Sequence, residues 1–270
     1  MCKDKKSILI LQYQSIVQNM DYKAEKIVPY ESNDAPKSVQ IECMFDEIAG
    51  QYDFLNHALS MGIDRYWRRK GILALKDYAP QSILDVATGT GDLALDAYRL
   101  LKPEKILGID ISEKMMAIGR EKAAKAGLSG IIHFDRQNCT CLQLDSETFD
   151  AAIVAFGIRN FEDLDKGLQE IHRVLHPEGR LMILELSTPE YFPMKQGYRI
   201  YSQLIPKIGQ WISRSKAAYK YLPKSISAFP QNAEMAAILK KNGFSDVTYR
   251  KLTGGVCTLY LAKKGDMVIK

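Results

Sequence analysis

Five short apolar segments alternate with helix-like segments through the middle of the chain, and this alternation limits the fold more than any other feature. The segments between the apolar ones include residues 91–102, 112–127 and 164–179, where apolar residues recur at helical spacing. Strands that alternate with helices of this length predict a mostly parallel sheet with helices on both faces. The predicted strands are 82–87, 105–111, 131–137, 148–157 and 180–187.

The C-terminal part of the chain predicts two antiparallel strands. A helical pattern over 233–244 precedes two apolar segments, 246–253 and 256–264, which are joined through Gly254 and Gly255. Two strands joined by such a short glycine turn form a β-hairpin. We therefore expect a Rossmann-like, mostly parallel seven-stranded sheet that ends in an antiparallel pair.

A glycine turn follows the first predicted strand, in the segment ILDVATGTGDLAL at residues 83–95. Glycine lets the backbone approach a ligand closely, so Gly89 and Gly91 predict a cofactor turn. Ala94 replaces the third glycine of a dinucleotide fingerprint. No Gly-Lys-Ser/Thr follows, which excludes a Walker phosphate loop.

Two acids near this turn indicate the kind of cofactor. Asp85 ends the first strand, where a cationic amino-acid ligand can use a carboxylate directly or through water. Asp110 ends the second strand, where a carboxylate accepts hydrogen bonds from a ribose hydroxyl. Asp110 suits NAD and S-adenosylmethionine alike, whereas Asp85 and the C-terminal hairpin favour S-adenosylmethionine.

Composition narrows the remaining classes of protein. The 270 residues carry a net charge of +5 without a dense basic stripe, which argues against nucleic-acid binding. No apolar stretch is long enough for a transmembrane helix. Five cysteines without a CxxC pair predict reduced thiols in a cytoplasmic protein, and four histidines without an HExxH motif predict no metal site.

The N-terminal part is predicted to be a flexible extension over residues 1–36, followed by a single domain over 37–270. Gln12 and Gln14 interrupt the apolar start and no A-x-A site follows, so we do not expect a signal peptide. Met20 offers an alternative translation start.

Apolar spacing over residues 37–50 predicts a helix with Val39, Cys43 and Ile48 on one face. Asp64 is predicted to cap the helix that begins at Arg65. Ser112 is predicted to start a later helix and Gly127 to stop it.

Five segments together resemble the ubiquinone/menaquinone biosynthesis C-methyltransferases: LDVATGTGD, GIDIS, TFDAAIVAFGIRNF, LHPEGRLMILELSTP and YKYLPKSISAFP. The glycine turn is shared by many methyltransferases, whereas FGIRN, ELSTP and AYKYLPKSI are far more specific. The resemblance runs from about Met44 to Lys264. It implies the fold of a class I S-adenosylmethionine-dependent methyltransferase, S-adenosylmethionine as cofactor and a lipophilic quinol as substrate.

The resemblance also implies which residues bind the cofactor. Cys139 stands where the family usually has alanine, in an Asn-Ala pair beside the adenine, and a small side chain can still line that slot. Ala155 stands where some relatives have serine, so one hydrogen bond to the cofactor is missing. The expected cofactor-binding residues are Asp85, Gly89, Thr90, Gly91, Asp110, Asn138, Cys139 and Ala155.

Carbon methylation of a quinol needs a phenolate whose charge reaches the ring carbon, held in line with the methyl group and its sulfur. Arg159 and Asn160 follow the fourth predicted strand, at the sheet edge where ligands bind. We expect Arg159 to stabilise the phenolate, directly or through water, and Asn160 to orient the ring oxygen. The structural alternative is that Arg159 pairs with Glu162 or Asp163. Tyr52 is expected to face substrate or cofactor and to relay a proton.

The segment YDFLNHALS matches the family's N-terminal motif. Asp53 and Asn56 are expected to order the helix that covers the cofactor. A lone histidine on a helix is more often structural than catalytic, so His57 is not expected to be the base. Trp67 is expected to pack in the core.

Residues 189–230 interrupt the alternation and hold eight aromatic side chains. These aromatics and a few cations suit a long isoprenoid tail and a membrane surface. We therefore predict a substrate lid that makes transient, peripheral contact with the inner face of the cell membrane. An interface in a homo-oligomer is the alternative use of this segment.

The expected reaction is C-methylation of demethylmenaquinol to menaquinol, because YKYLPKSISAFP is closer to menaquinone-type members. A ubiquinone precursor or another phenol, sterol or lipid remains the alternative substrate. A nucleic-acid methyltransferase is disfavoured, since FGIRN replaces an Asn/Asp-Pro-Pro-aromatic loop and no Pro-Cys dipeptide occurs. Arg159 and Asn160 argue against a module that binds cofactor without turnover.

Overall fold

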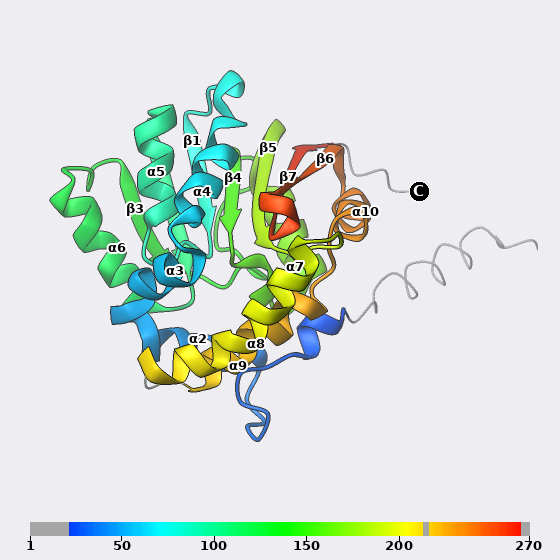
Figure 1. The fold of residues 1–270 in the computed structure, drawn as a ribbon. Helices are drawn as coiled ribbons and strands as arrows, with labels where there is room; N and C mark the ends of the chain where they lie inside the picture. The colour runs from blue at the N-terminus through cyan, green and yellow to red at the C-terminus, as the bar shows by residue number, and fades with distance from the viewer. Residues whose placement is uncertain (1–21, 213–215, 266–270) are drawn as a thin grey trace, which may run out of the picture.

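The computed structural model describes residues 22–212 and 216–265, and the side chains of 204–216 are not described. A seven-stranded sheet in the order β3-β2-β1-β4-β5-β7-β6 forms its centre (Figure 1). β1 to β5 run parallel to one another, whereas β7 is antiparallel to both β5 and β6. The predicted sheet with its C-terminal hairpin is confirmed. The strands are β1 (Ser82–Val86), β2 (Lys105–Asp110), β3 (Ile132–Arg136), β4 (Phe149–Ala155), β5 (Leu175–Leu186), β6 (Phe244–Leu252) and β7 (Cys257–Lys264).

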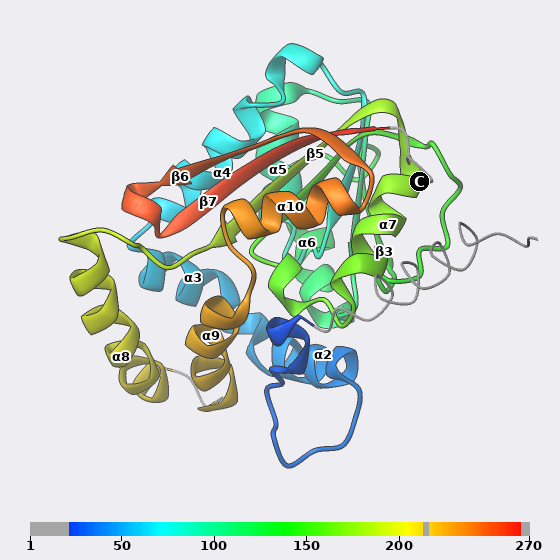
Figure 2. The same cartoon turned by 90° about the vertical axis from the view of Figure 1, so that its right-hand side faces the viewer.

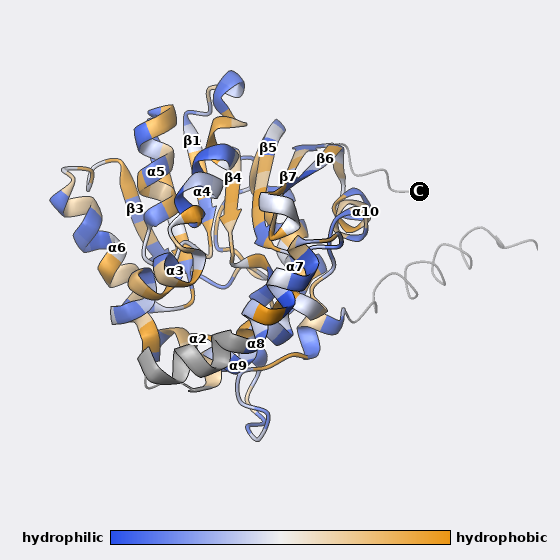
Figure 3. Cartoon of the chain, in the orientation of Figure 1, coloured by the Kyte–Doolittle hydropathy of each residue, from blue (hydrophilic) through white to orange (hydrophobic). Residues whose placement is uncertain are grey.

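Helices cover both faces of the sheet (Figure 2). Alternate residues of β1 serve the two cores: Leu84 and Val86 pack on one side and Ile83 on the other. Because β1 and β4 have helices on both faces, they are hydrophobic along most of their length (Figure 3). One face carries α4 (Ile63–Leu73), α5 (Asp92–Leu101) and α6 (Glu113–Lys125), and the other carries α7 (Leu164–Val174) and α10 (Ala233–Lys241).

Four further helices lie across the edge of the sheet at which the parallel strands end (Figure 1). They are α2 (Lys37–Ile48), α3 (Tyr52–Ser60), α8 (Met194–Ile212) and α9 (Lys216–Ala228). Short 3-10 helices join the elements: η1 (Lys23–Lys26), η2 (Ala49–Gln51), η3 (Lys76–Tyr78), η4 (Ile158–Asn160) and η5 (Thr253–Gly255). No helix in the described part of the chain is both long and apolar enough to cross a bilayer.

The N-terminal segment differs from the predicted flexible extension over its described part. Tyr22 and Ala24 are buried in the main core, and the Tyr22 hydroxyl donates to the carboxylate of Asp165 at 3.1 Å. Burial of apolar surface together with these polar contacts attaches residues 22–36 to the domain. Residues 1–21, including Met20, lie outside the described residues.

Local predictions were met in some helices and wrong in others. Ser112 caps α6 by accepting from the Met115 amide, and Gly127 follows its end at φ +70°, as predicted. Val39 is 44% exposed, because α2 turns Ile41 and Met44 inward instead.

Two other boundaries were also misplaced. α4 begins after Gly62, so Asp64 lies inside its first turn and pairs with Arg68 instead of capping. α7 ends at Val174, before the predicted stop at residue 179. The chain enters β5 at Leu175 because this residue pairs with Phe149 of β4.

Candidate active site

Two adjoining cavities open at the edge of the sheet where the parallel strands end. The sheet-edge cavity holds about 710 Å³ of empty space between α2 and the ends of β1, β2 and β4. The aromatic cavity holds about 1080 Å³ of empty space among α3, α8 and α9. Phe45, Tyr52 and Phe156 line both, so the cavities share a wall. This arrangement suits two ligands, one in each cavity, whose reacting groups meet where the cavities adjoin.

The glycine turn supplies one side of the sheet-edge cavity. Gly89 lies at φ +56° and lines the cavity. Gly91, at φ +76°, does not line the cavity. A Cβ at this position would lie 2.8 Å from the Phe134 ring, so glycine is needed for the close packing there. The structure thus separates a glycine that faces the cavity from one that allows close packing.

Asp110 lies in the sheet-edge cavity at the end of β2. Its Oδ2 accepts from the Gly89 amide at 2.8 Å and its Oδ1 from the Ser112 amide at 2.9 Å. Burial raises its pKa, while these backbone donors oppose that shift. Each carboxylate oxygen retains a lone pair, which fits the hydroxyls of a ribose.

Residues after β3 line another part of the sheet-edge cavity. Cys139 lines it, and burial raises the pKa of its thiol, which keeps that side chain neutral. Asn138 lies beside it, with its side-chain oxygen accepting from the Thr140 amide and hydroxyl. A cavity lined in this way, with a carboxylate at Asp110, has room and chemistry suited to a nucleoside such as the adenosine of S-adenosylmethionine. The other lining residues include Ile109, Ile111, Met115, Ala155 and Phe161.

Asp85 and Thr90 do not line either cavity. Asp85 is fully buried, its Oδ2 accepts from the Thr88 hydroxyl at 2.6 Å, and burial raises its pKa to about 7. Thr90 donates to Asp53 at 2.5 Å, and Asp53 also pairs with Lys122 of α6. Asp85 and Thr90 therefore stabilise the glycine turn without lining a cavity, and Asp53 connects α3 to this turn.

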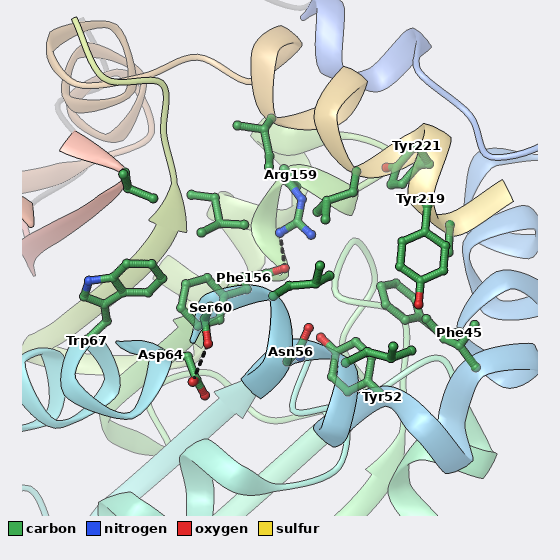
Figure 4. Close-up of a pocket in the computed structure, with 18 of the residues that line it drawn as sticks. Phe45, Tyr52, Asn56, Ser60, Asp64, Trp67, Phe156, Arg159, Tyr219 and Tyr221 are labelled. Carbon is green, nitrogen blue, oxygen red and sulfur yellow. Dashed lines mark hydrogen bonds between the residues drawn. The ribbon is translucent and has the colours of Figure 1, made fainter. Parts of the chain in front are cut away.

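Arg159 lines the aromatic cavity and is 6% exposed. Its Nη1 donates to Glu185 Oε1 at 2.8 Å and to the carbonyl of Phe156 (Figure 4). The partner is thus an acid of β5, not Glu162 or Asp163. Burial disfavours the charge, but the Glu185 carboxylate together with Tyr221 and Tyr52 more than offsets this effect, and the pKa of Arg159 is raised. Arg159 Nε is buried and makes no hydrogen bond with the described residues.

Asn160 and Tyr52 complete the contact between the cavities. Asn160 lines the sheet-edge cavity, and its Oδ1 accepts from the Tyr221 hydroxyl at 3.0 Å. Its amide nitrogen therefore remains a donor. Tyr52 lies in the shared wall beside Asn56 (Figure 4), and burial raises the pKa of its phenol. The structure therefore brings Tyr52, Arg159 and Asn160 to one place.

Sequence reasoning missed most of the aromatic cavity. It identified the 189–230 segment by its aromatic content but could not tell inward from outward rings, since that depends on how α8 and α9 pack. Trp67 is 3% exposed, as expected of a core residue, yet it also lines this cavity. His57 lines neither cavity, and its Nδ1 lies 2.9 Å from Asp64. The inward residues of the segment are Tyr198, Tyr201, Ala218, Tyr219, Tyr221, Leu222 and Ile226.

Comparison with solved structures shows the same fold. A methyltransferase from Thermotoga maritima, described as S-adenosylmethionine-dependent and a possible histamine N-methyltransferase, superposes with a TM-score of 0.57 at 16% identity. The match covers 83% of this chain and 99% of that one. An S-adenosylmethionine-dependent methyltransferase from Aquifex aeolicus gives a TM-score of 0.50 at 21% identity, over 68% and 82% of the two chains.

Sequence comparison is more specific. A demethylmenaquinone methyltransferase of Bacteroides fragilis is 57% identical over 91% of this chain and 100% of its own length. The enzyme of that name from Porphyromonas gingivalis is 46% identical, over 89% and 98%. A ubiquinone/menaquinone biosynthesis C-methyltransferase of Geobacter sulfurreducens is 42% identical, over 91% and 95%. A family model matches residues 33–264, and the chain belongs to the ubiE/COQ5 methyltransferase family.

Proposed function

We propose that this chain transfers a methyl group from S-adenosylmethionine to a ring carbon of demethylmenaquinol and so forms menaquinol. The observation that carries the proposal is the shared wall between a nucleoside-sized cavity and an apolar aromatic cavity. Relatives of 57% and 46% identity bear the name demethylmenaquinone methyltransferase, which supports a naphthoquinol acceptor.

The sheet-edge cavity would hold the methyl donor. S-adenosylmethionine supplies an electrophilic methyl group on a sulfonium. Asp110 would accept from the ribose, and Asn138, Cys139 and Ala155 would border the base. Gly89 leaves room for the backbone to approach the ligand. Asp85, Thr90 and Gly91 would act by holding the turn in shape.

Arg159 would stabilise the reactive form of the acceptor. A quinol becomes a carbon nucleophile when a phenolic proton leaves, because the negative charge then reaches the ring carbon. The Arg159 guanidinium, which lines the aromatic cavity, would donate to that phenolate oxygen and stabilise its charge. As the new carbon–carbon bond forms, the bond between the methyl carbon and sulfur would break and leave S-adenosylhomocysteine. The same ring carbon would then lose its proton to solvent, and the ring would regain aromaticity.

Asn160 and Tyr52 would orient the ring between the cavities. Because Tyr221 occupies the Asn160 oxygen, the Asn160 amide can donate to a ring oxygen. The raised pKa of Tyr52 keeps its hydroxyl protonated at neutral pH, so it can donate to an oxygen or relay a proton.

Residues 189–230 would form a substrate lid that meets a membrane. Tyr198 and Tyr201 of α8 line the aromatic cavity, while Phe192 and Ile200 are 80% and 62% exposed. Lys195 is exposed between them. A helix with apolar and basic groups outside and a lipid-sized cavity behind it suits peripheral contact with anionic lipid at the inner face of the cell membrane.

The lid proposal is tested by sedimentation with vesicles that contain anionic lipid. Phe192→Ser should weaken vesicle binding, whereas Tyr249→Ser, which changes an exposed aromatic on β6, should not. Equal binding by both variants would count against this surface. Gel filtration at several concentrations would show whether the same face joins subunits in a homo-oligomer.

The function is tested with purified protein, methyl-labelled S-adenosylmethionine and reduced demethylmenaquinol. We expect labelled menaquinone by mass spectrometry, and its loss in Arg159→Ala with S-adenosylhomocysteine binding retained. Methylation of a ubiquinone precursor but not of demethylmenaquinol would refute the substrate and keep the cofactor. Absence of cofactor binding would refute both.

A further inference from the structure

Lys37 is a buried cation to which the proposed reaction gives no role. It is the first residue of α2 and is 5% exposed. A charged amine in such a place is costly unless its N–H groups have acceptors. Its Nζ donates to three main-chain oxygens, those of Ala24 at 2.8 Å, Phe161 at 3.0 Å and Arg159 at 3.3 Å. All three ammonium hydrogens are thus satisfied, and by uncharged groups.

The three oxygens belong to segments that are far apart in the sequence. Ala24 lies in η1, whereas Arg159 and Phe161 are the neighbours of Asn160 in the turn after β4. α2 itself lines the sheet-edge cavity through Ser38, Ile41 and Phe45. One ammonium therefore joins the helix that covers the cavity to the backbone of the turn with the reactive side chains.

Other elements hold the side chains of this turn. Glu185 of β5 pairs with the Arg159 guanidinium, and Tyr221 of α9 donates to the Asn160 side chain. These contacts act near the ends of side chains, although Glu185 Oε2 also accepts from the Arg159 backbone amide at 3.3 Å. Lys37 acts instead on the carbonyls on either side of Asn160, which set the direction in which both side chains leave the backbone.

We propose that Lys37 is a positioning residue, whose ammonium fixes the turn Arg159–Phe161 and so aims Arg159 and Asn160 at the two cavities. The inference rests on the proposed methyl transfer for its activity measurement. Arginine is no substitute, because a planar guanidinium does not match three acceptors around one point. Glutamine keeps two N–H donors without the charge.

The pH dependence distinguishes positioning from structural support. Burial lowers the pKa of Lys37 to about 8 from its ordinary 10.5; Arg159 adds to this shift, while Glu25, Glu162 and Cys139 oppose it. The third donor is therefore lost as pH rises. Because the unfolded chain then binds more protons than the folded one, the contribution of Lys37 to the free energy of unfolding increases between these values. If Lys37 positions the turn, kcat should instead fall as pH rises past about 8, because the folded protein then loses the Lys37 proton.

The test compares Lys37→Met and Lys37→Gln with Lys23→Met, which removes an exposed lysine of η1, the element that also contains Ala24. Three quantities are measured: kcat for demethylmenaquinol, the Kd for S-adenosylhomocysteine, and hydrogen exchange of the amides of residues 158–161. For Lys37→Met we expect kcat to fall roughly 10- to 100-fold, since small misplacement of reacting groups has effects of that size. Exchange in the turn should rise, while the Kd should change by less than about threefold.

The other variants sharpen the comparison. Lys37→Gln should show an intermediate kcat and lose the alkaline fall above about pH 8, whereas Lys23→Met should match the wild type. Unchanged exchange in the turn, or unchanged kcat per folded molecule, overturns the inference. If Lys37→Met does not fold, Lys37→Gln carries the same comparison. If the wild type does not methylate demethylmenaquinol, the proposed function fails, and hydrogen exchange still decides the role of Lys37.

Discussion

Arg159 shows at the scale of single residues how one buried charge can be both stable and reactive. Glu185, itself 1% exposed, neutralises one side of the guanidinium. The Nε side makes no hydrogen bond with the described residues. In the proposed reaction, a guanidinium that protein acceptors only partly satisfy would suit an anionic oxygen, because its remaining N–H groups can donate to that oxygen.

Replacing Glu185 tests this division directly. Glu185→Gln keeps size and one acceptor but leaves the Arg159 charge without a counterion. We expect a loss of about 3 kcal/mol in the free energy of unfolding, as is typical when one partner of a buried pair is removed. We also expect kcat to fall roughly tenfold or more with little change in S-adenosylhomocysteine affinity. Urea unfolding and steady-state kinetics measure both, and Glu178→Gln on the exposed part of β5 is the control.

Tyr221 is expected to matter through Asn160. Tyr221→Phe removes the donor that fixes the Asn160 oxygen, so the amide can rotate and present the wrong group to the quinol. We expect kcat/KM for the quinol to fall roughly tenfold, because one hydrogen bond of about 1 kcal/mol and its orientation are lost. A double-mutant cycle with Asn160→Ala measures the coupling. Additive effects of the two substitutions would show that Tyr221 acts elsewhere.

At the scale of elements, the site depends on two turns that touch. The turn after β1 contains Ala87 at φ +53°, and the turn after β4 contains Gly157. A Cβ at Gly157 would lie 2.5 Å from the Ala87 Cβ, so glycine sets how closely the turns approach. Both turns line the sheet-edge cavity, and their separation therefore controls its shape.

Gly157→Ala should consequently weaken cofactor binding. The added methyl group must push the two turns apart, and we expect the Kd for S-adenosylhomocysteine to rise roughly tenfold, equivalent to about 1.4 kcal/mol. Calorimetric titration measures the change. Gly130→Ala is the matched control, because a Cβ there meets no atom within 4 Å. Equal affinities for the two variants would contradict the role of this contact.

At the scale of the whole molecule, burial of Asp85 makes the free energy of unfolding depend on pH. Burial raises the pKa of Asp85 to about 7, above its ordinary 3.8. The folded state therefore binds more protons than the unfolded state between these values, and the free energy of unfolding falls as pH rises through them.

Asp85→Asn removes this pH dependence. We expect the variant to gain stability relative to the wild type as pH rises, by about 4 kcal/mol over roughly three pH units. Urea unfolding at several pH values without ligand measures the difference. A constant difference between the two proteins would show that Asp85 does not titrate in this range.

The sheet was predictable because its information is local. Apolar segments such as 82–87 and the turn at Gly89 and Gly91 can be recognised within a few residues. The partners of the site residues could not be predicted in this way. Glu185 meets Arg159, and Lys37 meets the same turn, only after separate elements pack together. The structural alternative for Arg159, a pair with Glu162 or Asp163, named the wrong acid because it used proximity in the sequence as a guide to proximity in space.

The two cavities with one shared wall have a consequence for how such a protein changes over evolutionary time. The lining of the sheet-edge cavity comes from residues between 38 and 162, while helices of the 189–230 segment supply much of the lining of the aromatic cavity. Substitutions in that segment alter the shape offered to an acceptor without touching the turns around Gly89 and Asp110. If the proposed function holds, single substitutions in this segment could change the acceptor while binding of the methyl donor is kept.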